Sequence, residues 1–107
     1  LLFKGGNMDY EIKKDDNTII LKFKEAELIE TFSDEKYSDL LIQIAEENKN
    51  IILDFENVEV VDSLFIGALI IVDKKLASNG KTLKLINLNK FLSELFDKLR
   101  LGTNLEM

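Results

Sequence analysis

A carboxylate and a hydroxyl stand side by side at Asp62 and Ser63, directly before an apolar run that begins at Leu64. Residues 51–53 form a continuous apolar run, which is typical of a buried strand, so the pair lies where a strand passes through a turn into a helix. A helix N-terminus favours an anion, because its first N–H groups lack intrahelical partners. A phosphate on Ser63 would place about two negative charges at that position. The pair therefore fits a phosphoacceptor site, in which Asp62 orients the hydroxyl or helps to remove its proton.

The same pair also has a purely structural interpretation. Aspartate and serine are among the residues most often found at helix N-caps. An Asp-Ser pair before an apolar helix is therefore also typical of a helix that begins there and has no further role. The spacing alone leaves both interpretations open.

The composition argues against several kinds of chemistry. The 107 residues include no cysteine and no histidine, which removes disulfides, a thiol nucleophile, the usual zinc ligands and the imidazole base. Carboxylates cluster at Glu56, Glu59 and Asp62, but a solvated loop explains them better than a catalytic centre. We therefore predict that the protein is not an enzyme and uses no cofactor or metal.

Charge is distributed unevenly along the chain. The net charge of −6 disfavours nucleic acid as a partner, since such binding depends largely on cations that contact phosphates. Residues 25–47 hold eight acids and a single base, Lys36, whereas residues 74–100 hold seven bases against Glu94 and Asp97. These segments are interpreted either as solvated helix faces or as an acidic and a basic surface that orient a partner.

Targeting signals are not apparent in the sequence. The longest uncharged apolar run, residues 64–72, is nine residues long and too short to span a bilayer, which argues against membrane insertion. Residues 1–7 are expected to be an expression remnant or a disordered leader, because Met8 has the position of a natural initiator. We expect residues 8–107 to form one domain in the cytoplasm.

Alternation and turn residues predict the first half of the fold. Residues 8–13 and 18–23 read as two strands joined by a turn at residues 15–17. A helix follows, with Ser33 as its expected cap and an apolar stripe at Tyr37, Leu40, Leu41 and Ile44. The run at residues 51–53 then gives a third strand.

The second half continues the alternation of strands and helices. A helix is predicted from Ser63 to a stop at Asn79-Gly80, and residues 82–86 form the next strand. Asn89 is expected to cap a last helix that ends at Gly102, and residues 105–107 begin a final short strand. The apolar stripe of this last helix consists of Leu92, Leu95, Phe96 and Leu99. This order implies a mixed sheet with βαβ crossovers.

Residues 51–69 resemble the signature of the STAS domain family, which includes bacterial anti-sigma factor antagonists. That signature is a strand, an aspartate-rich turn and then Asp-Ser-Ser/Thr-Gly-Leu-Gly, and Asp54, Asp62, Ser63 and Gly67 carry the match. Residues 79–81 and 91–96 resemble the later half of the family. The resemblance implies a STAS-like single α/β domain, with a mixed four- to five-stranded sheet and three to four helices.

The resemblance also implies a function. In the family's regulatory members the first serine of the motif, here Ser63, is the phosphoacceptor, and Asp62 and Gly67 support that site. The unphosphorylated protein would bind an anti-sigma factor that is also a serine kinase, phosphorylation would release it, and a serine phosphatase would reset it. The alternative is a constitutive STAS subunit of a lipid-transport ATPase, with Ser63 only a helix cap. The sequence leaves open whether the protein forms a homodimer.

Two residues depart from the family pattern. Leu64 stands where the family has a second Ser/Thr, and Phe65 stands where it has glycine. One hypothesis makes both an exposed apolar rim that binds a partner, and the other makes them core. Gly67, one turn into the predicted helix, suggests close packing of that helix on the sheet. The Gly-Glu-Leu-Asp that often ends the family's second strand is represented by residues 25–28, without the aspartate.

Overall fold

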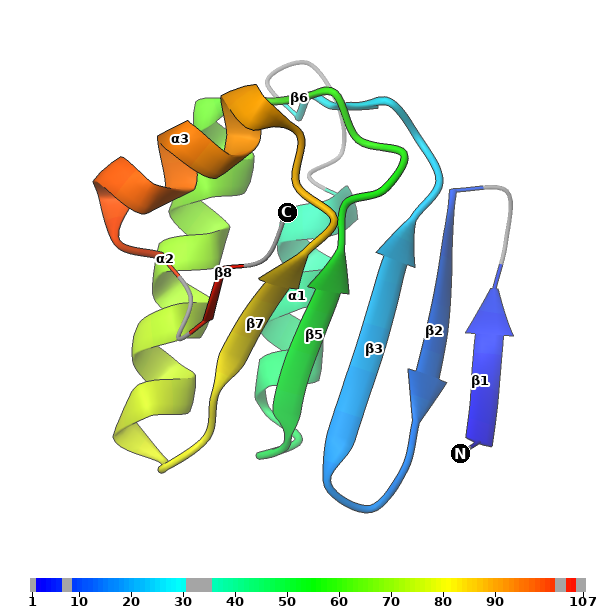
Figure 1. The fold of residues 1–107 in the computed structure, drawn as a ribbon. Helices are drawn as coiled ribbons and strands as arrows, with labels where there is room; N and C mark the ends of the chain where they lie inside the picture. Colours follow the sequence, from blue (N-terminus) through cyan, green and yellow to red (C-terminus); the bar gives the residue numbers. More distant parts are fainter. Residues whose placement is uncertain (1, 7–8, 31–35, 102–103, 106–107) are drawn as a thin grey trace.

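The computed structural model describes residues 2–6, 9–30, 36–101 and 104–105, and these contain a mixed sheet with helices against it (Figure 1). Its strand order is β1-β2-β3-β5-β7-β8, in which β1, β2 and β3 are antiparallel and β3, β5, β7 and β8 are parallel. A separate parallel pair is formed by β4 and β6. The strands are β1 (Leu2–Gly6), β2 (Tyr10–Lys14), β3 (Thr18–Phe23), β4 (Glu27–Leu28), β5 (Asn50–Asp54), β6 (Val60–Val61), β7 (Leu83–Ile86) and β8 (Asn104–Leu105).

The predicted opening hairpin is present as β2 and β3. Tyr10 pairs with Phe23 at its open end, and Asp15 forms the turn at the other end. The Asp15 Oδ1 atom accepts the N–H groups of Asn17 and Thr18, each at 2.8 Å. These bonds lower the pKa of the exposed Asp15 carboxyl, because they stabilise its charged form. Asp15 thus fixes the hairpin register by local side-chain chemistry.

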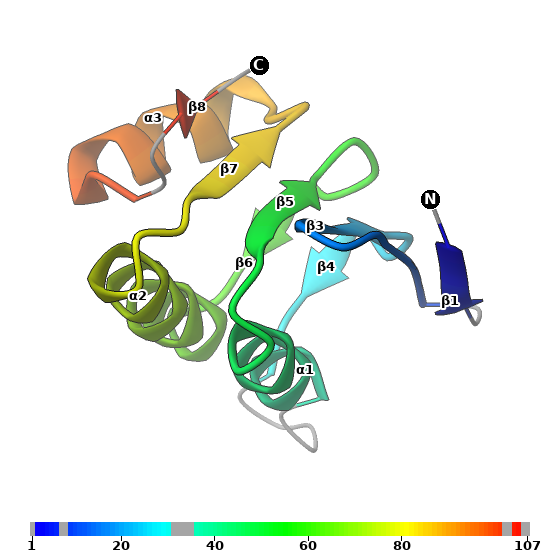
Figure 2. The same ribbon diagram turned by 90° about the horizontal axis from the view of Figure 1, so that it is seen from below.

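Three helices are described: α1 (Lys36–Ala45), α2 (Ser63–Ser78) and α3 (Lys90–Leu99). Helices α1 and α2 lie side by side against one face of the sheet, and α3 lies near the β7–β8 edge (Figures 1 and 2). Both connections, β3 to β5 and β5 to β7, step across the sheet in the same direction, and right-handed crossovers therefore place α1 and α2 on the same face. Their N-termini consequently lie together, at the end of the sheet where the parallel strands finish. No described helix is long and apolar enough to cross a membrane.

The core lies between the sheet and helices α1 and α2, and Leu92 and Phe96 of α3 belong to the same buried cluster. Alternate strand residues are fully buried, as expected for strands that present one face to helices. The stripe predicted for α1 is confirmed, with Tyr37, Leu41 and Ile44 buried and Leu40 half-buried. The fully buried residues of β3, β5 and β7 are Ile19, Leu21, Phe23, Ile51, Leu53, Leu83 and Leu85.

The STAS-like α/β fold class is confirmed, but the strand count is higher than predicted. Residues 2–6, which the sequence analysis assigned to a remnant or disordered leader, form β1 and pair with β2. Otherwise β2 would be an edge strand with unpaired backbone groups, and such an edge readily accepts another strand. The β4–β6 pair was not predicted, because two-residue strands are too short to show alternation.

Helix α3 begins as predicted but ends earlier than predicted. Asn89 caps α3 as expected, accepting the Leu92 N–H at 2.7 Å. However, α3 ends at Leu99, with Arg100 as the C-cap at φ 53°, rather than at Gly102. Arg100 takes the left-handed conformation that usually favours glycine. Ser33, Met8 and Gly102 lie outside the described residues.

Candidate functional site

Asp62 holds the start of α2. It is the N-cap residue, with an extended backbone, and its Oδ1 atom accepts the Phe65 N–H at 3.1 Å. Its Oδ2 atom accepts the Glu30 N–H at 2.7 Å. Both carboxylate oxygens of Asp62 therefore accept hydrogen bonds from backbone N–H groups, so Asp62 positions the backbone at the start of α2.

Ser63 is the first residue of α2, and it is exposed. Ser63 is therefore not the cap of α2, because Asp62 occupies the cap position, and this corrects the cap assignment alone. Either residue type can cap a helix, so the sequence did not distinguish them. The structure places the Ser63 hydroxyl at the surface of a helix N-terminus whose geometry Asp62 fixes.

Glu30 is a structural residue of the site that the sequence analysis missed. It is 1% exposed, and its Oε1 atom accepts the N–H groups of Tyr37 at 2.6 Å and Ser38 at 3.0 Å. Its Oε2 atom accepts the Ser38 hydroxyl at 2.5 Å. Glu30 thereby satisfies backbone donors in the first turn of α1, as a cap does, although it precedes the helix by several residues. No local sequence signal marks such a contact.

The β4–β6 pair brings the two helix starts together. Leu28 pairs with Val61, and the Leu28 carbonyl accepts the Asp62 N–H at 3.2 Å. Glu30, two residues beyond Leu28, then reaches both Asp62 through its backbone and α1 through its carboxylate. One short segment therefore connects the N-termini of α1 and α2.

Charged and hydroxyl groups surround the start of α1. The Lys36 Nζ atom contacts Asp9 at 2.8 Å and Glu25 at 3.1 Å, and the bond to Asp9 is the main reason that the pKa of Lys36 is raised. The Tyr37 hydroxyl donates to Glu25. Burial, reinforced by that bond, raises the pKa of the Tyr37 phenol far above its usual range. Lys36 therefore stays charged and Tyr37 stays neutral around pH 7.

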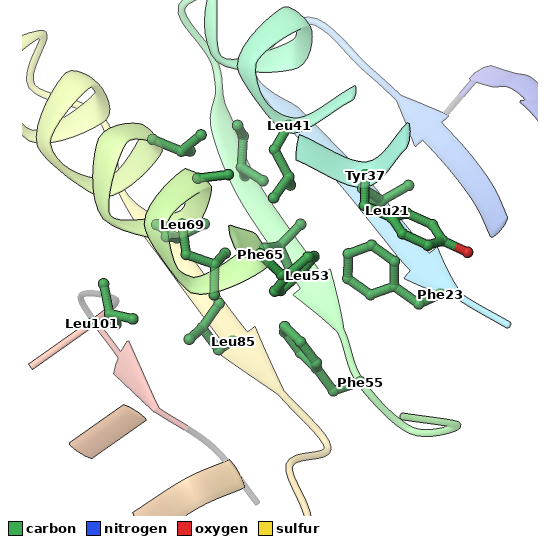
Figure 3. Packing of buried hydrophobic residues seen from close by; sticks show 14 of the residues in the cluster. Leu21, Phe23, Tyr37, Leu41, Leu53, Phe55, Phe65, Leu69, Leu85 and Leu101 are labelled. Atoms are coloured by element: carbon green, nitrogen blue, oxygen red, sulfur yellow. The ribbon is translucent and has the colours of Figure 1, made fainter. Parts of the chain in front are cut away.

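Phe65 belongs to the core, so the prediction that it binds a partner is wrong. It is 0% exposed, and its ring centroid lies 5.6 Å from that of Phe23 and 6.2 Å from that of Phe55 (Figure 3). Consecutive helix residues point in directions about 100° apart, because a turn contains about 3.6 residues. Leu64 and Phe65 therefore cannot share one face, and only Leu64, 41% exposed, lies at the surface.

Gly67 does not pack against the sheet, so the predicted close packing is wrong. A Cβ atom placed on Gly67 would meet no atom within 4 Å. Gly67 instead lines a surface groove of about 260 Å³ between α1 and α2. The other residues that line this α1–α2 groove are Ser38, Ile42, Ser63, Leu64, Ala68 and Ile71. The structure thus brings Ser63, Leu64 and Gly67 together in one wall and directs Phe65 away from them.

Replacing Gly67 with alanine is expected to stabilise the protein. The added methyl group meets open space, while alanine is the better helix former by about 1 kcal/mol. Urea denaturation should show a rise of about 0.5–1 kcal/mol in the free energy of unfolding. A decrease would mean that Gly67 makes a tight contact, contrary to the structure.

The comparison with protein families identifies the fold type. A family model for the STAS domain matches residues 9–106, which is nearly the whole chain. The chain belongs to the STAS domain family. In this STAS chain, the Asp62-Ser63 pair, the groove and the β4–β6 pair all lie within the matched residues. A search of curated proteins finds no significant match.

Solved structures share this STAS fold. A STAS domain protein from Planctomyces limnophilus matches with a TM-score of 0.76 and 16% identity, over 92% of this chain and 91% of the other. A candidate anti-sigma factor antagonist from Thermotoga maritima matches with a TM-score of 0.68 and 22% identity, over 92% and 86%.

The anti-sigma factor antagonist SpoIIAA is similar in two states. Its unphosphorylated form matches with a TM-score of 0.71, over 92% of this chain and 86% of SpoIIAA. The phosphorylated form, from Bacillus, matches with a TM-score of 0.70, over 92% and 90%. Both are 16% identical to this chain. At such identities the likeness establishes the fold alone.

Proposed function

We propose that this STAS protein is an anti-sigma factor antagonist that acts as a phosphorylation-controlled binding switch in the bacterial cytoplasm. Unphosphorylated, it binds an anti-sigma factor that is also a serine kinase; phosphorylation of Ser63 releases it, and a serine phosphatase resets it. The observation that carries the proposal is the exposed Ser63 at the N-terminus of α2, in the wall of the α1–α2 groove.

The local geometry supports phosphate on Ser63. A phosphate at the first residue of a helix lies near N–H groups and the positive end of the helix dipole. Asp62 already holds this helix start through two backbone bonds, so the phosphate need not distort the helix. SpoIIAA, which shares the fold, exists in both unphosphorylated and phosphorylated forms.

The surroundings of Ser63 also explain why phosphate would release a partner. Ser63 and Leu64 line the same groove, and Leu64 is 41% exposed. A partner that covers Leu64 must also cover Ser63 or come very close to it. Burying a phosphate dianion without compensating cations is costly, so phosphorylation should weaken such a complex.

The Ser63→Ala variant tests the phosphoacceptor. Each serine kinase of histidine-kinase-like ATPase fold in the source genome is incubated with ATP and the protein, and mass spectrometry locates any phosphate. We expect one of these kinases to add a single phosphate to wild type and none to Ser63→Ala. The control is Ser78→Ala, at the exposed end of the same helix, which should be phosphorylated normally. Phosphate that persists in Ser63→Ala would refute the assignment.

Loss of phosphate in Ser63→Ala should not reflect unfolding. Because Asp62 rather than Ser63 is the cap, this surface substitution should change the free energy of unfolding by no more than about 0.5 kcal/mol. Chemical denaturation of both proteins checks this. A loss of about 1 kcal/mol or more would indicate that Ser63 stabilises the helix end.

The alternative function, a constitutive STAS subunit of a lipid-transport ATPase, predicts a different result. In that case none of the kinases would modify Ser63, and Ser63→Ala would bind its partner as wild type does. The phosphorylation assay therefore distinguishes the two functions directly.

A further inference from the structure

We propose that the α1–α2 groove receives an amphipathic helix from the protein's partner, with apolar side chains in the groove and a basic flank along α1. The identification of that partner as the anti-sigma factor rests on the proposed function. The shape of the groove, its apolar lining and the charges on its borders support this occupant.

The shape of the groove suits side chains of a helix. Its volume of about 260 Å³ is slightly below the roughly 300–1,000 Å³ that is usual for small-molecule pockets. Along α2 its lining extends from Ser63 to Ile71, which corresponds to roughly 12 Å at 1.5 Å per residue. That length matches about two turns of a docked helix. Gly67 lies midway along this wall and keeps it open, since it has no side chain.

The lining is apolar on both walls. Ile42 of α1 is 37% exposed, while Leu64 and Ile71 of α2 are 41% and 55% exposed. Three large apolar side chains that are exposed around one groove are typical of a surface that is covered by another protein. Grooves of this kind accept the i, i+3, i+4 and i+7 residues of an amphipathic helix.

The borders of the groove define the charge of the helix that fits. Asp39 precedes Ile42 by three residues and lies on the same face of α1, and Glu46 lies in the turn directly after α1; both acids are exposed. On α2, the exposed Lys74 follows Ile71 by three residues, at the end far from Ser63. A helix with lysines or arginines on the flank that meets α1 is complementary to this arrangement.

Ser63 places the switch inside this docking surface. It lines the end of the groove near the N-termini of both helices, opposite Ser38. A phosphate there needs water around it and would prevent an apolar side chain from entering that end. The docked helix and the phosphate would therefore compete for the same space.

The test uses a synthetic amphipathic peptide of about 18 residues, long enough to be helical, with a leucine stripe and a lysine flank. A second peptide carries glutamates in place of the lysines. Calorimetry measures affinity, and ¹⁵N NMR shifts locate the binding site. We expect the lysine peptide to shift the amides of Ile42, Gly67 and Ile71, and to bind at least tenfold more tightly than the glutamate peptide.

Variants of the protein distinguish binding of the lysine peptide in the groove from its general attraction to an acidic protein. Gly67→Leu should fill the groove and weaken binding at least tenfold, whereas Ala77→Leu, a similar enlargement at an exposed position elsewhere on α2, should not. Asp39→Lys with Glu46→Lys should weaken binding at least fivefold, whereas Glu94→Lys with Asp97→Lys, the same change of net charge on α3, should have little effect. Cooperative urea unfolding of each variant confirms that it is folded.

The proposal is overturned if the lysine peptide binds without shifting groove amides, does not bind, or binds Gly67→Leu as tightly as wild type. None of these measurements requires a kinase or ATP. Groove binding without any phosphorylation of Ser63 would refute the proposed function alone. Phosphorylation of Ser63 with no groove binding would refute the docking proposal alone.

Discussion

Phe65→Gly is expected to lower the free energy of unfolding by at least about 3–5 kcal/mol, which is the usual loss when a buried phenylalanine side chain is removed. Phe65 is fully buried and contacts the rings of Phe23 and Phe55, so its loss removes apolar burial and leaves a cavity between α2 and the sheet. A glycine in a helix adds up to about 1 kcal/mol. Urea denaturation measures the total.

The matched control is Leu64→Gly, one residue earlier in the same turn. Leu64 is 41% exposed, so its replacement should cost mainly the glycine penalty of about 1 kcal/mol. Equal losses for the two variants would contradict the orientation of α2. If the Phe65→Gly variant is as stable as wild type, Phe65 is not part of the core.

Glu30→Met should produce the second large effect, a loss of about 2–5 kcal/mol. Methionine has a similar length but offers the N–H groups of Tyr37 and Ser38 and the Ser38 hydroxyl no equivalent acceptor. Each buried donor left without a partner costs about 1–3 kcal/mol, and part of this is recovered if water enters. Urea denaturation gives the size of the loss.

The control for Glu30→Met is Glu27→Met, an exposed position in β4, which should change stability by no more than about 0.5 kcal/mol. Hydrogen exchange then locates the effect, because the amides of Tyr37 and Ser38 should exchange faster in Glu30→Met than in wild type. If their exchange is unchanged, Glu30 is not the group that holds the start of α1.

Local chemistry made much of the fold predictable. The Asp15 turn, the Asn89 cap and the α2 stop at Asn79-Gly80 depend on neighbouring residues only, and all three are confirmed. The strand at residues 51–53 was visible as an apolar run for the same reason, although only Ile51 and Leu53 are buried and Ile52 is half-buried. Hydrophobic periodicity predicted the order of the remaining elements, and the family motif added the fold type.

The orientation of α2 was not predictable, because this helix is apolar around most of its circumference. Residues 64–72 contain no charged residue, so the pattern could not show which side faces the sheet. The structure resolves this by burying Phe65, Leu69, Val72 and Leu76. Leu64 and Gly67 fall on the groove side as a consequence.

The contacts that position the candidate site join residues far apart in the sequence. Glu30 and Asp62 are 32 residues apart, and they meet only because β4 pairs with β6. Likewise, the groove requires α1 and α2 to lie side by side, which follows from the crossover connections rather than from any local pattern. Ser63 could be named from the sequence, but its surroundings could not.

The central claim is that phosphate on Ser63 releases the partner. Calorimetry tests this release most directly. The kinase that phosphorylates Ser63 is titrated with the unphosphorylated protein and, under identical salt and nucleotide conditions, with the Ser63-phosphorylated protein. We predict that phosphorylation weakens binding at least tenfold, equivalent to about 1.4 kcal/mol. Equal affinity for the two forms would contradict the account, even if Ser63 is phosphorylated.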